Sequence, residues 1–213
     1  MKRKDEVVAA NTKGVEFLFK KNKVTWAKGY GMLKAGNAVE VRALDGSITT
    51  YRPKNVIVAT GSRPRHLDGI PVDNTLICDN TGALAFDAVP KRLGVIGAGV
   101  IGLELGSVWK RLGAEVTILE ALPEFLAAAD AAVAREAWKV FTKKQGLDIR
   151  LGVKINKVTT GKKGITVEYD AGDESHVLEC DKLIVSVGRV PNTEGLGCEA
   201  VGLKLDERGR IDV

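Results

Sequence analysis

The sequence has few residues of the kinds that form disulfides or bind metal ions. Its three cysteines, Cys78, Cys180 and Cys198, include no C-x-x-C or other close pair, which argues against a disulfide framework, a zinc site or a local redox pair. We expect them to be buried as small hydrophobic residues. The two histidines, His66 and His176, lie in no motif that would make either one a base or a ligand. We therefore predict no metal site and no functional role for either histidine.

Long apolar runs are also absent. No segment approaches the roughly eighteen apolar residues of a membrane helix, and the basic start, MKRKDEVVAA, has no apolar segment behind it to make a secretory signal. We expect a cytoplasmic protein that does not bind a membrane. With 213 residues, 45% of them hydrophobic, the chain can bury a sizeable core, as one large domain or as one domain with parts of another.

The positive net charge is confined to one end of the chain. The net charge is +5, but residues 1–34 hold 9 Lys/Arg and 3 Asp/Glu, leaving 23 and 24 for the rest. The basic residues lie on a predicted helix, Lys2 to Lys21, whose apolar residues, such as Val7, Val15 and Leu18, form one face. A solvated helix face explains this charge, and we expect no nucleic-acid partner.

One short pattern, I-V-x-x-G-x-x-P, occurs twice, at residues 57–64 and 184–191, with an offset of 127. Each copy follows alternating segments typical of a β-meander, and the apolar run before each glycine is typical of a strand buried on both faces. The predicted strands are Lys23–Lys28, Ala38–Ala43, Ile48–Tyr51 and Asn55–Ala59 in the first copy, and Val153–Thr159, Ile165–Tyr169, Val177–Cys180 and Lys182–Val187 in the second.

Between the copies lies a glycine-rich turn with the pattern G-x-G-x-x-G. It directly follows an apolar run, Leu93 to Ile96, and it opens a helix that we expect to end near Gly113, before a strand at Glu115–Leu119. Strand, glycine turn, helix and strand form the unit that binds dinucleotides.

Each glycine of this turn has a predicted mechanical role. Gly97 makes the tight turn, Gly99 lets the backbone approach a pyrophosphate, and Gly102 packs the helix closely on the sheet. The helix N-terminus then offers free N–H groups to the phosphates. A second helix, around Ala131 to Lys144, is predicted to have Asp130 as its N-cap.

An acidic residue lies at the position where this type of unit binds the ribose of the dinucleotide. Glu120 ends the second strand, 18 residues after Gly102. A carboxylate there accepts hydrogen bonds from the ribose hydroxyls of NAD and repels the phosphate of NADP, and Ala121-Leu122-Pro123 supply no cation to reverse this. The sequence therefore predicts NAD as the cofactor. The simpler alternative is that Glu120 is a surface residue at a strand end with no role in binding.

The second copy of the repeat is complete, whereas the first lacks a glycine turn, which would fall upstream of Met1. We therefore expect an internal fragment that begins inside a domain. The predicted fold class is α/β, with a Rossmann-like dinucleotide-binding domain that carries a β-meander, plus incomplete segments of a second domain of the same type. The predicted boundaries are 1–79 for the first segment of this second domain, 80–191 for the NAD-binding domain and 192–213 for the returning segment of the second domain.

Three strings carry a family resemblance: ATGSRP, GAGVIGLELGSVWKRLGAEVTILEALPEFL and VGRVPNTEGLGCEAVGLKLDERGRIDV. The chain resembles the flavin-dependent disulfide reductases, or pyridine nucleotide-disulfide oxidoreductases, and within them the dihydrolipoamide dehydrogenases, over nearly all its residues. The resemblance implies a homodimeric flavoprotein in which electrons pass from dihydrolipoamide through a disulfide and FAD to NAD. It also implies partners in 2-oxo acid dehydrogenase complexes, namely the lipoyl domain and the dihydrolipoyl acyltransferase.

The chain departs from this family pattern in what it lacks. It has no FAD-phosphate glycine motif, no redox C-x-x-x-x-C, no later flavin-contacting Asp and no interface domain with a His-Glu acid/base pair. We therefore expect no catalytic residue in this chain.

The resemblance assigns two sets of cofactor residues. Glu104 is expected near the nicotinamide end, Ile155 beside the adenine and Gly188 close to the nicotinamide; simpler roles are a plain helix position for Glu104, near Lys110 and Arg111, and plain core for Ile155. Thr60-Gly61-Ser62 has the simpler reading of a strand-ending turn. The NAD set is Gly97, Ala98, Gly99, Val100, Ile101, Gly102, Leu103, Glu104, Glu120, Ile155 and Gly188, and the FAD set is Gly31, Thr60, Gly61 and Ser62.

Two alternatives to this function stay open. One is another flavin disulfide reductase, such as a soluble transhydrogenase or a mercuric or glutathione reductase, and Glu120 argues against the NADP-linked members. The other is a non-catalytic nucleotide-binding module.

Overall fold

A computed structural model describes residues 1–213, and in it the chain forms two compact units. One unit comprises Met1–Arg63 and Val190–Val213, and the other is Pro64–Arg189. The chain passes between them at β4 (Ser62–Pro64) and β13 (Arg189–Pro191), which pair with each other.

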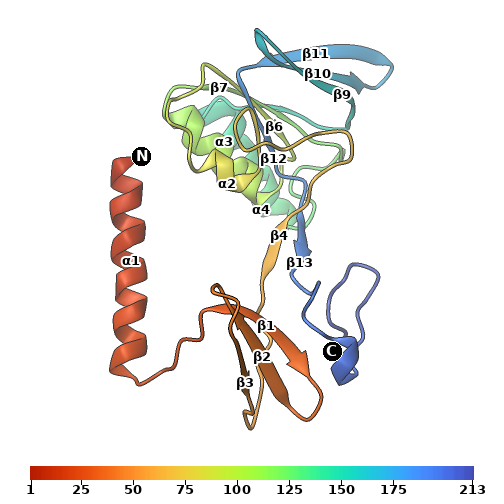
Figure 1. Cartoon of the computed structure of the whole chain (residues 1–213). Coiled ribbons are helices and arrows are strands. Elements are labelled where there is room, and N and C mark those ends of the chain that lie inside the picture. The colour runs from red at the N-terminus through yellow and green to blue at the C-terminus, as the bar shows by residue number, and fades with distance from the viewer. The chain divides into compact units, whose positions relative to one another are not determined.

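The Pro64–Arg189 unit is built on a five-stranded parallel sheet with the order β5-β12-β6-β7-β8. Figure 1 labels three of these strands, β6, β7 and β12. Its strands are β5 (Ile77–Cys78), β6 (Arg92–Ile96), β7 (Glu115–Leu119), β8 (Asp148–Arg150) and β12 (Lys182–Val185). Its helices are α2 (Asn80–Ala83), α3 (Val100–Arg111) and α4 (Ala131–Lys139), the last continued by a π-helical turn, Val140–Lys144. Its antiparallel meander is β9 (Val153–Gly161), β10 (Gly164–Ala171) and β11 (Glu174–Cys180).

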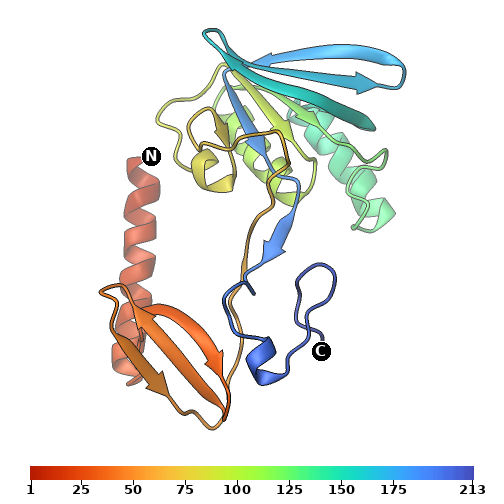
Figure 2. The ribbon, with the colours of Figure 1, turned by 45° about the vertical axis from the view of Figure 1, so that its right-hand side comes forward.

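Both faces of this sheet are covered, which explains the unbroken apolar runs of its strands. Alternate residues of β6 point to opposite faces: Val95 packs with α3 residues such as Leu103, whereas Ile96 packs with the meander at residues such as Val167. The meander crosses the face opposite α3 (Figure 2). The result is a three-layer Rossmann-like domain, so the predicted α/β fold class is confirmed.

The start of this unit lies earlier than the predicted domain boundary at residue 80. β5 is an edge strand of the sheet, since Ile77 and Cys78 pair in parallel with β12. The α2 helix that follows packs on α3: Trp109 donates an indole hydrogen bond of 3.2 Å to the Ala83 carbonyl and packs against Phe86. β12 ends at Val185, short of the predicted Val187.

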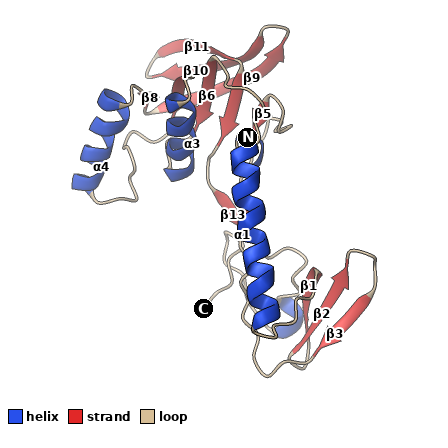
Figure 3. Cartoon of the chain, turned by 90° about the vertical axis from the view of Figure 1, so that its left-hand side faces the viewer, coloured by secondary structure: helices blue, strands red, loops and turns tan.

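The other unit holds α1 (Lys2–Lys21), a meander of β1 (Gly29–Lys34), β2 (Ala38–Ala43) and β3 (Ile48–Tyr51), and a 3-10 turn at Glu199–Val201. Figure 3 shows α1 as one continuous helix, with the predicted bounds. No residue of α1 is buried.

Two predicted strands in this unit are wrong. Lys23–Lys28 is not a strand, because Trp26 packs edge-on against Phe19 of α1, with Lys28 over the indole, and the first strand begins only at Gly29. Asn55–Ala59 is an irregular segment, exposed except for the partly buried Val58, because no strand of this chain pairs with it on either side.

The second helix prediction is confirmed. Asp130 caps α4, since its Oδ1 accepts hydrogen bonds from the N–H groups of Ala132 (2.8 Å) and Val133 (3.4 Å). The three cysteines are free and buried, as expected. Burial raises the pKa of the Cys78 and Cys180 thiols to about 11, so neither is a reactive thiolate near neutral pH.

Candidate functional site

The glycine-rich turn lies between β6 and α3, at the carboxyl end of the parallel sheet. Gly97 has a φ of +104°, and a Cβ atom there would lie 2.5 Å from the carbonyl oxygen of Ser186. A Cβ atom on Gly102 would overlap the carbonyl oxygen of Gly97 and lie 2.6 Å from Ser186 Oγ. The fold itself therefore requires glycine at the first and third positions of the pattern, because a Cβ at either position would strike backbone.

The middle glycine has a different environment. Gly99 is the N-cap of α3 with φ −71° and ψ 178°, a conformation open to any residue. A Cβ atom there would meet nothing within 4 Å. No side chain caps this helix end, so the first-turn N–H groups remain available to an acceptor. The fold does not need a glycine at Gly99, and the open space there leaves room for a ligand to approach the backbone.

Glu120 braces this turn from the end of β7. Its Oε2 accepts a hydrogen bond of 2.7 Å from the Ala98 N–H, and its Oε1 accepts one of 2.9 Å from the Leu122 N–H. The Gly97 N–H also donates to the Leu119 carbonyl at 2.8 Å, which joins the turn to the same strand. A carboxylate has about four acceptor positions, so Glu120 keeps room for ligand hydroxyls while it holds the loop.

An open groove of about 750 Å³ runs beside these residues. It brings together five of the predicted NAD residues: Gly97, Gly99, Glu120, Ile155 and Gly188, the last of which has a φ of +112°. The other lining residues are Leu67, Ile96, Leu119, Ala121, Leu122, Gly152, Val153, Lys154, Ser186 and Val187.

The remaining predicted NAD residues lie outside the lining of this groove. Ala98 and Leu103 are buried in the core, so only their backbone is available to a ligand, and the Ala98 N–H is already bonded to Glu120. Ile101 is partly buried against the same core. Val100 and Glu104 are exposed on the outer face of α3.

The predicted flavin residues all belong to the other unit. Gly31 is exposed on β1, paired with Val41 of β2. The carbonyls of Thr60 and Gly61 accept hydrogen bonds of 3.0 Å each from the side chain and the backbone N–H of Asn192. A groove of about 790 Å³ in this unit is lined by apolar residues such as Leu33, Val58 and Leu203, but by none of the four predicted FAD residues.

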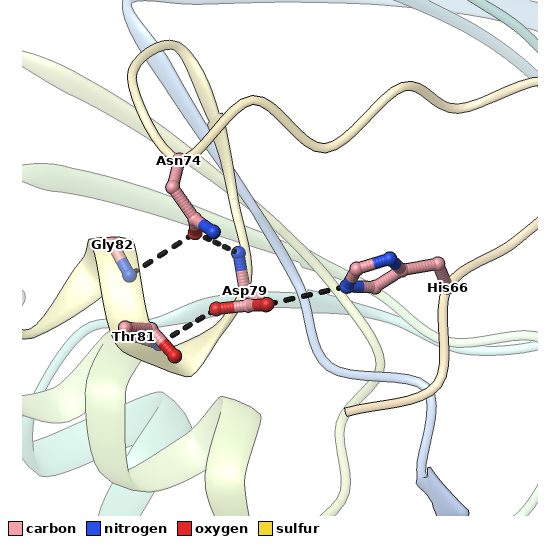
Figure 4. Close-up of polar contacts among 5 residues, drawn as sticks. All are labelled: His66, Asn74, Asp79, Thr81 and Gly82. Atoms are coloured by element: carbon pink, nitrogen blue, oxygen red, sulfur yellow. Dashed lines mark hydrogen bonds and ion pairs between the residues drawn. The ribbon is translucent and has the colours of Figure 1, made fainter. Parts of the chain in front are cut away.

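His66, for which the sequence predicted no functional role, lies in a polar network. His66 Nε2 is 3.2 Å from Asp79 Oδ2, and the other oxygen of Asp79 accepts a 2.7 Å hydrogen bond from the Thr81 N–H (Figure 4). Asp79 is thus the N-cap of α2, and an Asp two residues before a Thr-Gly turn was a signal that could have marked it. The ring of His176 stacks on that of Tyr169, with 5.4 Å between the ring centroids, and its Nε2 lies 3.7 Å from Glu174 Oε2.

Two further features bear on function. No cluster of three or more His, Cys, Asp or Glu side chains lies close enough together to hold a metal ion. None of the helices combines the length and apolar character needed to cross a lipid bilayer.

The chain has close relatives among known proteins. It is 61% identical over 214 residues to the dihydrolipoyl dehydrogenase of Cupriavidus necator, covering 100% of this chain and 45% of the relative. It is 47% identical over 213 residues to dihydrolipoyl dehydrogenase 3 of Pseudomonas putida, covering 99% of this chain and 46% of that protein. The chain therefore spans about half the length of the curated relatives it matches.

A solved structure shows the same fold. The LpdA protein of Mycobacterium tuberculosis superposes with a TM-score of 0.85 at 27% identity, covering 96% of this chain and 45% of that one. The family model described as pyridine nucleotide-disulphide oxidoreductase matches residues 1–213. With the braced glycine turn, this match over the whole sequence shows that the chain belongs to the pyridine nucleotide-disulphide oxidoreductase family.

Proposed function

We propose that the groove beside the glycine turn binds NAD(H). The observation that carries this proposal is the contrast among the three glycines: Gly97 and Gly102 are required by contacts within the fold, whereas Gly99 faces open space at an uncapped helix N-terminus. The first-turn N–H groups of α3 would hold the pyrophosphate, because they are unpaired donors at the positive end of the helix. Ile155 would lie beside the adenine, and Gly188 and Glu104 near the nicotinamide.

Glu120 would select NAD over NADP. Its carboxylate stays within hydrogen-bond reach of the turn and has acceptor positions left for the ribose hydroxyls. A 2′-phosphate at the same place would meet a like charge, and no Lys or Arg follows in Ala121-Leu122-Pro123. The same carboxylate would therefore order the loop and choose the cofactor.

We propose that this chain forms part of a longer protein, like its relatives, and that this longer protein is a dihydrolipoyl dehydrogenase. Such an enzyme is a homodimeric flavoprotein that oxidises dihydrolipoamide and works in 2-oxo acid dehydrogenase complexes with the lipoyl domain and the dihydrolipoyl acyltransferase. When bound, NAD+ supplies the hydride acceptor, and this chain's residues bind and orient it. Gly31 and Thr60-Gly61-Ser62 would contribute to the FAD site. We place the protein in the cytoplasm.

Titration of the purified chain tests the nucleotide site. NADH and NADPH are titrated separately, with binding heat as the readout. We expect saturable binding of NADH and at least tenfold weaker binding of NADPH. Equal affinities for the two nucleotides would contradict the role given to Glu120, and no saturable binding of either would contradict the site itself.

For this chain by itself, one observation favours a second function, that of a non-catalytic nucleotide-binding module. Its three thiols are free and buried, and Cys78 and Cys180 have raised pKa values, so the chain has no exposed dithiol to exchange with a substrate. The test is to purify the chain with excess FAD, record its visible spectrum and assay NAD+ reduction by dihydrolipoamide. A stoichiometric flavin complex that turns over would contradict the module function.

A further inference from the structure

Three consecutive residues at the start of the nucleotide-binding unit each contact a different group. The Arg65 N–H donates a 2.9 Å hydrogen bond to the carbonyl of Gly188, which itself lines the groove. His66 contacts Asp79 through its imidazole. Leu67 lines the groove. The 65–67 segment thus reaches the groove through Leu67 and is bonded to Gly188 through Arg65.

Asp79 is a firmly held anchor for this segment. It follows β5, and its side chain is 8% exposed, against 49% for His66. Its N–H donates to Asn74 Oδ1 at 3.1 Å, and the same oxygen accepts from the Gly82 N–H at 3.1 Å (Figure 4). Two hydrogen bonds through one amide oxygen, together with the cap on Thr81, fix the carboxylate relative to α2.

The carboxylate is also charged. Although burial pushes the pKa of Asp79 upward, the hydrogen bonds from Thr81 and His66 lower it overall. An ionised acceptor forms a stronger hydrogen bond than a neutral one. The half-exposed imidazole therefore has a charged, firmly held partner.

Leu67 is held by contacts of its own and by those of the residues before it. Its carbonyl accepts a 3.2 Å hydrogen bond from the Ile70 N–H, so a turn holds the chain after it. Its side chain packs, partly buried, on the core cluster that includes Ile70 and Ile77. Before it, the segment is held by two bonds only, from Arg65 to Gly188 and from His66 to Asp79. Loss of the second would leave a single backbone bond between β4 and Leu67.

We propose that His66 is a positioning residue for the dinucleotide, and that its contact with Asp79 holds Leu67 against the end of the groove beside Gly188. The proposal rests on the proposed function of the groove. A half-exposed polar contact adds little to global stability, so the main effect of His66 falls on the local order of the 65–67 segment, and through it on nucleotide affinity.

Four single variants, and the double variant that combines His66→Leu with Asp79→Asn, test this proposal in the 213-residue chain. His66→Leu removes the contact, His66→Gln keeps an N–H donor near the Nε2 position, and Asp79→Asn keeps an oxygen to cap α2. His176→Leu is the matched control, because His176 lies on β11 and lines no part of the groove. The measurements are the Kd of NADH, by titration calorimetry, and amide hydrogen exchange of residues 64–73 without nucleotide.

We expect His66→Leu to raise the Kd about fivefold, the scale of a half-exposed hydrogen bond to a charged group, and to speed exchange in residues 64–73. His66→Gln should restore most of the affinity, and His176→Leu should leave the Kd unchanged. Asp79→Asn combined with His66→Leu should add little to His66→Leu alone, because both remove the same contact.

Several outcomes would overturn the proposal. An unchanged Kd in His66→Leu, in a chain whose wild type binds NADH, would refute it and leave the proposed function intact. A further fivefold loss in the double variant would show that the two residues act separately. A lower melting temperature with unchanged affinity would make the contact merely structural. A wild-type chain that does not bind NADH would refute the proposed function and, with it, this inference.

Discussion

Replacing the glycines of the turn one at a time separates what the fold needs from what the ligand needs. Gly99→Ala adds a methyl group where nothing lies within 4 Å, in a backbone conformation that alanine adopts freely. Gly102→Ala adds the same methyl group against the Gly97 carbonyl and Ser186 Oγ. The two substitutions are chemically identical and three residues apart. We expect Gly102→Ala to lower the stability of the fold, and Gly99→Ala to lower the affinity for the nucleotide.

The expected magnitudes follow from these contacts. At Gly102 backbone must move, and overpacking of this kind costs about 3 kcal/mol or more, which lowers the melting temperature by roughly 6–12 °C in a unit of this size. At Gly99 the cost is that of alanine instead of glycine at an N-cap, about 1 kcal/mol or less. The new methyl group, however, fills the space through which a pyrophosphate would reach the backbone. NADH should therefore bind at least tenfold more weakly, a loss of about 1.4 kcal/mol, and Gly99→Val should bind none detectably.

Thermal denaturation followed by far-ultraviolet circular dichroism measures the first effect, and titration calorimetry with NADH measures the second. Gly99→Ala should keep the wild-type spectrum and nearly the wild-type melting temperature while losing affinity. Wild-type affinity in Gly99→Val would refute the phosphate-cradle argument. Equal melting temperatures for Gly102→Ala and Gly99→Ala would refute the packing argument.

Three further predictions follow from other contacts. Glu120→Gln keeps one oxygen that can accept a hydrogen bond from a backbone N–H. It should weaken NADH binding by up to about tenfold and reduce the preference for NADH over NADPH. An unchanged preference, measured by titration with both nucleotides, would show that Glu120 does not select NADH. The hydrogen bond and charge of Arg92 lower the pKa of Asp181, so this pair stabilises the fold above about pH 4, and the stability is lost as pH falls through the lowered pKa. Asp181→Asn should therefore flatten the pH dependence of the melting temperature between about pH 5 and 2, and a variant with the wild-type slope would contradict this. The chain alone should bind FAD weakly or not at all and lack dihydrolipoamide oxidation, which the visible spectrum and an NAD+ reduction assay check.

The glycine turn was predictable because its geometry is set by residues adjacent in sequence. Gly97, Gly99 and Gly102 lie within six residues, and their roles follow from backbone conformation and the start of a helix. The position of Glu120 also followed from spacing. Its bond to the Ala98 N–H did not, because the direction of a side chain depends on how two parallel strands are aligned.

Contacts between distant segments were the part that sequence patterns could not supply. His66 and Asp79 are separated by an irregular loop, and only the folded path from β4 to β5 brings them within 3.2 Å. No periodicity marks such a pair. The edge strand β5 was missed for a related reason, since two residues are too few to show a pattern and their strand character comes from β12 beside them.

The two copies of I-V-x-x-G-x-x-P show directly how much a neighbour decides. Ile57 and Ile184 occupy the same place in the pattern, yet Ile57 is 90% exposed and Ile184 is 0% exposed. Ile184 lies in β12, which has β5 on one side and β6 on the other, whereas residues 55–59 have no hydrogen-bonded strand beside them. A central strand of a parallel sheet has its backbone groups satisfied only by its neighbours. An apolar run therefore indicates that a segment can form a central strand. Whether it does so depends on the presence of neighbouring strands that pair with it.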